Sequence, residues 1–305
     1  MKVSDLSESD LRGLLKQGNL LLQISPFVAR IRSDVHKVAH EIALMYGDFT
    51  VCQPEGFADF HVEVAREAGL RRWFYPLARF AFDGRRSFVP LPAAQAFPMI
   101  EWGLNWCVAA HAHQYLVIHA AVIEKGGRAA VLPAPPGSGK STLCAGLVNR
   151  GWRLLSDELA LYDLATGLIH GMARPVNLKN ASIDVIRAFA PEAVFTVPVP
   201  DTTKGTVALM RPPSASVLRA QEPVRAAWII LPKYEANAEA VLSVHGKAET
   251  FMLVAEQSFN YDVHGLRGFN AVADLLDQCA SHTFTYGHLD DAVRVFERLA
   301  AEPAS

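Results

Sequence analysis

The spacing of hydrophobic and polar positions in this 305-residue chain predicts helices and strands along its whole length. In the first part, the pattern predicts a helix over residues 4–17, a strand over 27–32, a helix over 34–46, a strand over 60–65, a hairpin that turns at 83–86, and a helix over 93–112. We interpret residues 1–112 as an accessory α+β region, and we recognise no chemistry in it.

Residues 113–305 have the pattern of an α/β domain. Apolar runs at 115–123 and 128–132 flank a glycine-containing turn and predict an antiparallel hairpin. Later in the chain, the pattern predicts a helix at 141–150, a strand at 152–155, a hairpin of 159–162 with 168–171, a helix at 182–189, a strand at 226–231, and helices at 247–257, 266–279 and 289–299. The proline-rich segment 195–213 predicts a mobile loop.

A phosphate-binding loop is predicted between the first hairpin of this domain and the helix that follows. The sequence there is Ala134-Pro135-Pro136-Gly137-Ser138-Gly139-Lys140-Ser141-Thr142, with alanine at a position where glycine is usual. Small residues let successive backbone N–H groups close around phosphate oxygens, Lys140 adds positive charge near the β- and γ-phosphates, and the Ser141 hydroxyl can ligate Mg²⁺. We therefore expect ATP and Mg²⁺ as cofactors. The candidate nucleotide-binding residues are Gly137, Ser138, Gly139, Lys140, Ser141 and Thr142.

Three further side chains are candidates for the chemistry. Asp157 and Glu158 follow the strand predicted at 152–155, and carboxylates at such a strand end beside a phosphate loop suit a Mg²⁺ ligand and a catalytic base. Folding of the first hairpin would place His119 opposite Pro133, where the loop begins. The alternative for the acid pair is a solvated turn. For His119, a hydrogen-bonded core histidine is an equally good interpretation on spacing alone.

Four cations lie on predicted turns and not inside helices or strands, namely Arg174, Lys179, Lys204 and Arg211. Cations on loops of a nearly neutral chain are candidates for contacts to the acceptor or to the γ-phosphate. Each one taken alone is more often an ordinary surface charge.

Composition limits the possible partners and the location. With 29 Lys+Arg against 31 Asp+Glu, the chain has no strong overall charge that would recruit nucleic acid or an acidic membrane. No apolar run has the length of a membrane span, and the first residues lack a signal peptide's apolar core, so we expect a cytoplasmic protein. The four widely spaced cysteines predict reduced, mostly buried thiols.

Three segments together resemble the catalytic core of the HPr serine kinase/phosphorylase family: Ile118-His119-Ala120-Ala121, the loop from Gly137 to Thr142, and Gly151-Trp152-Arg153-Leu154-Leu155-Ser156-Asp157-Glu158. The chain is most similar to the HPr-kinase-related kinase A group, with which it also shares residues at 174–179, 204–206, 211–213, 259–261 and 268–270. The resemblance covers roughly residues 115–300 and, more weakly, the region before them. It implies a P-loop nucleotide-binding core of the HPr kinase and phosphoenolpyruvate carboxykinase type, here with an N-terminal accessory region.

The resemblance also implies roles for individual residues. Asp157 would take the proton of the acceptor hydroxyl, and Ser141, Glu158 and Asp157 would form the metal site. His119 would contact the transferred phosphoryl group, and Lys140 would neutralise charge. Glu158 stands where the family has a second aspartate, which makes this ligand one methylene longer.

The predicted function is therefore Mg-ATP-dependent transfer of the γ-phosphoryl group to a hydroxyl acceptor. The acceptor would be a serine of a protein or peptide, or a small molecule, because related kinases modify serine in lasso peptides. An ATP-binding sensor or scaffold without phosphoryl transfer is the main alternative. Carboxykinase-like chemistry is a weaker one, because it needs a second metal site and an organic-acid pocket. The oligomers of HPr kinases make a homo-oligomer possible.

Overall fold

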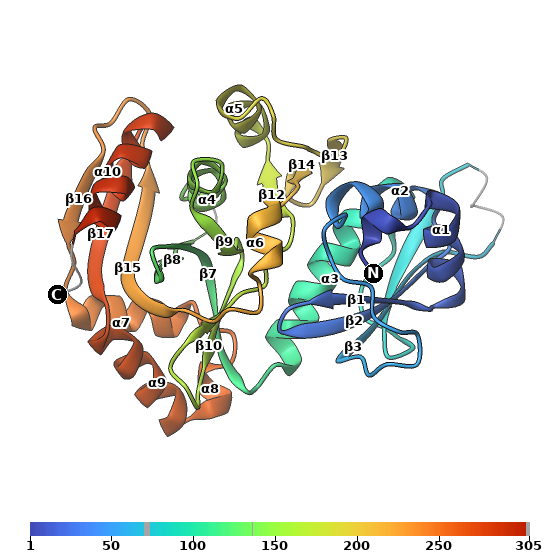
Figure 1. Ribbon diagram of the computed structural model, residues 1–305, viewed down its shortest axis with the longest axis horizontal. Helices are drawn as coiled ribbons and strands as arrows, with labels where there is room; N and C mark the ends of the chain where they lie inside the picture. Colours follow the sequence, from blue (N-terminus) through green and yellow to red (C-terminus); the bar gives the residue numbers. More distant parts are fainter. Residues whose placement is uncertain (70–73, 136, 303–305) are drawn as a thin grey trace.

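The computed structural model describes residues 1–69, 74–135 and 137–302, and it has a mixed α/β fold. Figure 1 shows two main sheets formed by successive parts of the chain, the first in blue on the right and the second from green to red in the centre and on the left. The α/β class predicted from the sequence is confirmed.

The first sheet is built from residues 20–92. Its order is β1-β2-β3-β4-β5, with β6 beside β4. These strands are β1 (Leu20–Ile24), β2 (Phe27–Ser33), β3 (Phe60–Arg66), β4 (Leu77–Phe82), β5 (Arg85–Arg86) and β6 (Leu91–Pro92). The predicted hairpin forms, but its turn is only Asp83 and Gly84, both at positive φ, so that β5 begins within the stretch predicted as turn.

Helices α1 (Glu8–Gln17), α2 (His36–Met45) and α3 (Ala96–His111) pack with this sheet, together with the short helices η1 (Val3–Asp5) and η3 (Ala93–Gln95). The first helix begins later than predicted because Ser7 caps it: the Ser7 hydroxyl accepts a hydrogen bond from the N–H of Asp10 at 3.1 Å. It ends at Gly18, whose φ of 74° suits glycine.

The second sheet has the order β11-β10-β7-β8-β15-β17-β16, with β9 also paired to β7. Its strands are β7 (Tyr115–Lys125), β8 (Arg128–Pro133), β9 (Arg153–Ser156), β10 (Leu159–Asp163), β11 (Ile169–His170), β15 (Arg225–Tyr234), β16 (Val241–Val244) and β17 (Ala280–Tyr286). Strands β8, β15 and β17 are parallel neighbours, so their carboxyl ends meet at one edge. We did not predict β17, although it alternates threonine with aromatic residues.

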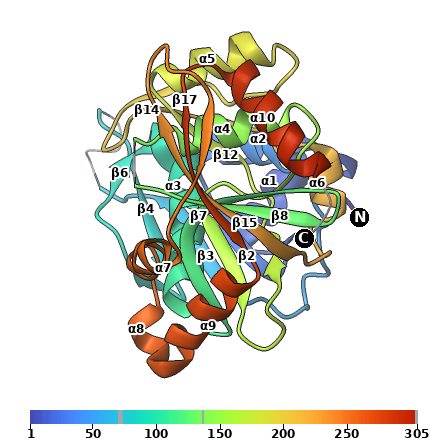
Figure 2. The ribbon, with the colours of Figure 1, turned by 90° about the vertical axis from the view of Figure 1, so that its left-hand side faces the viewer.

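Helices cover both faces of the second sheet (Figures 1 and 2). On one face, α4 (Lys140–Val148) and α10 (Leu289–Ala301) share a hydrophobic cluster with Leu132 of β8. On the other, α7 (Lys247–Glu256) and α9 (Leu266–Asp277) share a cluster with Val131, with α8 (Tyr261–His264) between them in the chain. Adjacent residues of β8 thus point to opposite layers, as expected for a strand buried on both faces.

A small third sheet, with the order β12-β14-β13, lies between the two main sheets in Figure 1. It comprises β12 (Val176–Lys179), β14 (Gly205–Met210) and β13 (Val199–Thr202), and α5 (Ala181–Phe189) and α6 (Ser214–Leu218) belong to the same part of the chain. The prediction of a loop over 195–213 is wrong. We took Pro200 as a sign of a loop, but it lies in β13, the edge strand of this sheet, where proline is tolerated.

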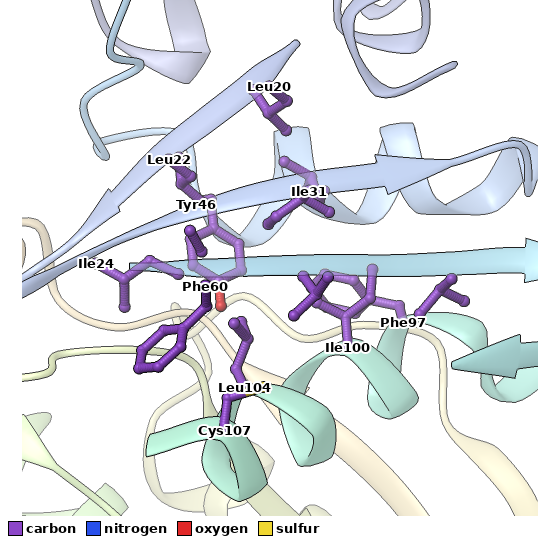
Figure 3. Close-up of a cluster of buried hydrophobic side chains, with 14 of the residues drawn as sticks. Leu20, Leu22, Ile24, Ile31, Tyr46, Phe60, Phe97, Ile100, Leu104 and Cys107 are labelled. Atoms are coloured by element: carbon purple, nitrogen blue, oxygen red, sulfur yellow. The ribbon is translucent and has the colours of Figure 1, made fainter. Parts of the chain in front are cut away.

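The accessory region and the second sheet share one hydrophobic core. Figure 3 shows Phe97, Ile100, Leu104 and Cys107 of α3 against strand residues of the first sheet. The same cluster continues into the second part of the chain through Val117, Leu159, Leu161, Met172 and Leu209. The strands of the first sheet end at Pro92 and those of the second begin at Tyr115. The hydrophobic packing is continuous across residue 112, where we placed the domain boundary.

We predict that Gly103→Ala destabilises the protein by about 1–3 kcal/mol, because a methyl group there would overpack the contact between α3 and β4. A Cβ atom at Gly103 would lie 2.0 Å from Cε2 of Phe80. Gly13→Ala on α1 is the matched control, since no described atom beyond its chain neighbours and its own helix backbone lies within 4 Å of the added Cβ. It should stabilise the protein by about 0.5–1 kcal/mol. Denaturant unfolding measures both, and equal effects would contradict the close packing of α3.

Candidate functional site

The glycine-rich loop joins the carboxyl end of β8 to the first turn of α4. Gly137 and Gly139 have φ values of 89° and 87°, a region that glycine enters without strain. The helix begins at Lys140, one residue earlier than predicted. The first N–H groups of a helix lack carbonyl partners within it, so this end of α4 favours an anion. Pro136 lies outside the described residues.

Two tyrosines at the ends of β15 and β17 hold the loop in place. The Tyr286 hydroxyl donates a hydrogen bond to the carbonyl of Gly139 at 2.9 Å, and the N–H of Tyr234 donates to the carbonyl of Ser138 at 2.9 Å. A Cβ atom at Gly139 would lie 2.6 Å from the Tyr286 hydroxyl oxygen. Only glycine fits between the loop and the sheet at this position.

A cleft of about 1020 Å³ opens beside the loop, at the edge where the parallel strands end. The loop residues Gly137 to Thr142 line it together with His119, Asp157 and Glu158. Further walls come from the end of β12 with α5, from the segment that joins β17 to α10, and from Lys204, Tyr234 and Asn237. The structure thus brings all the predicted nucleotide-binding, catalytic and metal-binding residues to one cleft.

Lys140 is a buried cation in the wall of this cleft, only 7% exposed. Burial lowers the pKa of its ammonium group to about 8, against the opposing effect of Asp157 and Glu158. Its Nζ atom has no hydrogen-bond partner among the described residues, and the same is true of Ser138 Oγ and Asn177 Oδ1, which also line the cleft. Buried polar atoms without partners are costly, so this cluster indicates a polar ligand.

Asp157 is buried in the turn between β9 and β10. Burial raises the pKa of its carboxyl group to about 7, and the adjacent Glu158 carboxylate adds to the rise. The N–H of Asn177 donates to Asp157 Oδ2 at 3.0 Å and orients the group. A carboxyl group whose pKa lies near neutral pH is suited to take and return a proton.

His119 lies on β7 and lines the cleft. The predicted register is wrong by one position, because Ala120 and not His119 pairs with Pro133. Burial lowers the pKa of the imidazole below its ordinary value, and the charge of Lys140 adds to this effect. Its Nδ1 atom lies 3.2 Å from Gln257 Oε1. The imidazole is therefore mostly neutral at pH 7, and because Nδ1 donates its proton to Gln257 Oε1, the Nε2 atom is a hydrogen-bond acceptor in the cleft.

Glu158 makes contacts that the sequence did not indicate. Its Oε2 atom accepts a hydrogen bond from Asn105 Nδ2 at 2.6 Å, and its Oε1 atom lies 3.9 Å from Lys204 Nζ. Lys204 in turn lies over the ring of Trp102, 5.2 Å from its centroid. Asn105 and Trp102 belong to α3, in the region where we had recognised no chemistry. No local motif marks them, because only the fold brings them to Glu158.

The four cations proposed for substrate contacts have different positions. Lys179 and Lys204 line the cleft, whereas Arg174 and Arg211 are absent from its described lining. Arg174 is buried behind it in a pair with Glu101 at 3.1 Å. Arg211 pairs with Asp48 of the accessory region at 2.8 Å. We therefore keep Lys179 and Lys204 as candidates for substrate contacts and assign Arg174 and Arg211 to interactions between the two parts of the chain.

Comparison with known proteins adds no assignment: no family model and no curated protein matches the chain. Within residues 1–69, 74–135 and 137–302, no group of three or more His, Cys, Asp or Glu side chains is arranged to hold a metal ion. No helix in the described part of the chain is long and apolar enough to cross a membrane.

We predict that Asp157→Asn stabilises the protein at pH 8 and has little effect near pH 4. The raised pKa means that between about pH 4 and 7 the folded protein keeps a proton that the unfolded chain has lost, so the stability of the parent falls as pH rises through this window. Asparagine carries no charge and avoids the loss. Thermal melting of both proteins should show an advantage of at least about 2 °C at pH 8. An equal difference in melting temperature between the variant and the parent at pH 4 and pH 8 would contradict the burial of Asp157.

Proposed function

We propose that this protein is a Mg-ATP-dependent kinase that transfers the γ-phosphoryl group to a hydroxyl acceptor. The observation that carries the proposal is the buried ammonium of Lys140, which lacks a partner among the described residues and stands at the start of α4, beside a loop with two left-handed glycines. An anion bound there would satisfy the ammonium and the free N–H groups of the helix together.

A nucleoside triphosphate fits the cleft better than a small anion. The cleft extends well beyond the loop, and its volume of about 1020 Å³ is at the upper end for small-molecule sites. The described segments are also arranged as strand, loop and helix, the order that a P-loop requires. The resemblance of residues 115–300 to HPr-kinase-like proteins supports the same proposal.

Mg²⁺ would be held by the Ser141 hydroxyl and the Glu158 carboxylate, with Asp157 adjacent. Mg²⁺ commonly uses one or two carboxylates together with substrate phosphates, so it does not need a cluster of three acidic or histidine side chains. When bound, the ion would neutralise charge that builds up on the phosphate oxygens. The oxygen donors that line the cleft are of the type that Mg²⁺ prefers.

The chain's own residues would position the reactants and move one proton. The acceptor oxygen forms a bond to the γ-phosphorus while the bond from that phosphorus to the β–γ bridging oxygen breaks, and ADP leaves with the electron pair. Asp157 takes the proton of the acceptor hydroxyl, for which its pKa of about 7 is suited. Lys140 and the first N–H groups of α4 stabilise negative charge, and His119 contacts the transferred group.

A sensor or scaffold that binds ATP without transferring phosphate remains the second candidate, since no feature of the cleft specifies an acceptor. Incubation with γ-labelled ATP and cell extract or candidate peptides, followed by mass spectrometry, would identify an acceptor.

We predict that Lys140→Met lowers affinity for a non-hydrolysable ATP analogue at least about tenfold, because a charge-assisted hydrogen bond contributes roughly 1.5–3 kcal/mol. The same change should leave the melting temperature unchanged or raise it, because it removes a buried charge that lacks a partner among the described residues. Isothermal titration calorimetry measures the affinity. Lys37→Met, at an exposed position of α2, is the control and should bind like the parent. Equal affinity of Lys140→Met and the parent would refute the proposed site.

We further predict that Asp157→Asn binds the ATP analogue within about threefold of the parent but turns ATP over at least about 100-fold more slowly, the usual contribution of a general base. Analogue binding and release of labelled phosphate or phosphorylated acceptor give the two quantities. If the parent binds the analogue but has no turnover with any acceptor or with water, the sensor is the better assignment.

A further inference from the structure

The helix α3, although part of the accessory region, contacts the candidate metal-binding carboxylate. Asn105 donates through Nδ2 to Glu158 Oε2 at 2.6 Å and accepts a hydrogen bond from Arg174 through Oδ1. We infer that Asn105 is a positioning residue that orients the Glu158 carboxylate for Mg²⁺, so that the accessory region is an essential part of the site. The inference rests on the proposed function, because it assigns the metal to Glu158.

Asn105 is itself fixed by a chain of buried polar groups. Arg174 donates to the Glu101 carboxylate at 3.1 Å and to the Glu101 carbonyl at 3.3 Å, and the Tyr46 hydroxyl donates to the same carboxylate at 2.5 Å. Tyr46, Glu101 and Arg174 are all buried. These contacts connect α2, α3 and the segment before β12 to the cleft. Each of these residues has a partner in the network, although Arg174 Nε has none among the described residues, so losing any member leaves a further buried polar group unsatisfied.

The two carboxylate oxygens of Glu158 have different surroundings. Asn105 occupies Oε2, whereas Oε1 lies 3.9 Å from Lys204 Nζ, a distance at which the charges attract without a hydrogen bond. Trp102, one turn before Asn105 on α3, holds Lys204 over its ring. A half-buried glutamate has several rotatable bonds, and ordering them costs conformational entropy. The hydrogen bond from Asn105 already orders the Glu158 side chain. It leaves Oε1 as the oxygen that can exchange the Lys204 ammonium for a metal ion.

The test is metal affinity in the protein–ADP complex, measured with Mn²⁺ as the probe by the loss of the free-ion signal in electron paramagnetic resonance. Asn105→Ala should lower Mn²⁺ affinity about tenfold or more, the usual effect of removing a group that orients a metal ligand. Its affinity for ADP in the presence of EDTA should equal that of the parent. Asn19→Ala is the matched control, because Asn19 bonds only to Gln17 among the side chains of the described residues and lies in the same accessory region. It should bind Mn²⁺ like the parent.

A double-mutant cycle separates positioning from a general structural effect. If Asn105 acts through Glu158, then Asn105→Ala should weaken Mn²⁺ binding no further in a protein that already carries Glu158→Gln. Additive losses would overturn the inference, and so would parent-like Mn²⁺ affinity in Asn105→Ala alone. Asn105→Ser, which leaves a smaller gap, should show the same loss of Mn²⁺ affinity in a form whose folding is confirmed by its melting curve.

Mn²⁺ binding by the parent protein distinguishes a failure of the proposed function from a failure of the role inferred for Asn105. If the parent shows no Mn²⁺ binding that depends on ADP, then the proposed function fails and the inference fails with it. If the parent binds Mn²⁺ and ADP together while Asn105→Ala behaves identically, then only the role of Asn105 is refuted.

Discussion

The site depends on one unfavourable arrangement, a lysine ammonium held in a buried wall without a partner among the described residues. Leaving such a charge unpaired costs free energy, which a fold tolerates where a ligand will compensate. The neighbouring loop and strand ends hold the lysine in this position. Two left-handed glycines shape the loop, and Tyr234 and Tyr286 hold it against the ends of two parallel strands. The strand edge thus sets the position of the lysine.

The acid pair shows how neighbouring residues acquire different properties from different surroundings. Burial raises the pKa of Asp157 to about 7, against the opposing effect of the hydrogen bond from the N–H of Asn177. Glu158 is half-buried and lies between Asn105 and Lys204. The first is suited to hold a proton and the second to meet a cation. Because Asn105 comes from α3, the geometry of the acid pair depends on contacts between the two parts of the chain.

Local sequence patterns were sufficient for the α/β class, the loop and the grouping of His119 with the acid pair, because each rests on a strand, turn or helix signal within a few residues. Local patterns failed where contacts between distant segments determine the structure. The segment 195–213 forms strands because β12 offers β14 a partner. Arg211 faces Asp48, and Asn105 reaches Glu158, through packing that no short pattern encodes. The turn at Gly126 and Gly127 shifted the register of His119 by one position.

The central claim is that Lys140 receives a nucleotide phosphate, and a crystal structure with Mg²⁺ and a non-hydrolysable ATP analogue tests it most directly. We expect the terminal phosphates within the curve of residues 137–142, with Lys140 Nζ about 2.7–3.1 Å from a phosphate oxygen and Mg²⁺ between that phosphate and Glu158. A nucleotide bound elsewhere, or a Lys140 side chain that pairs with Asp157 while the phosphates point away, would contradict the account.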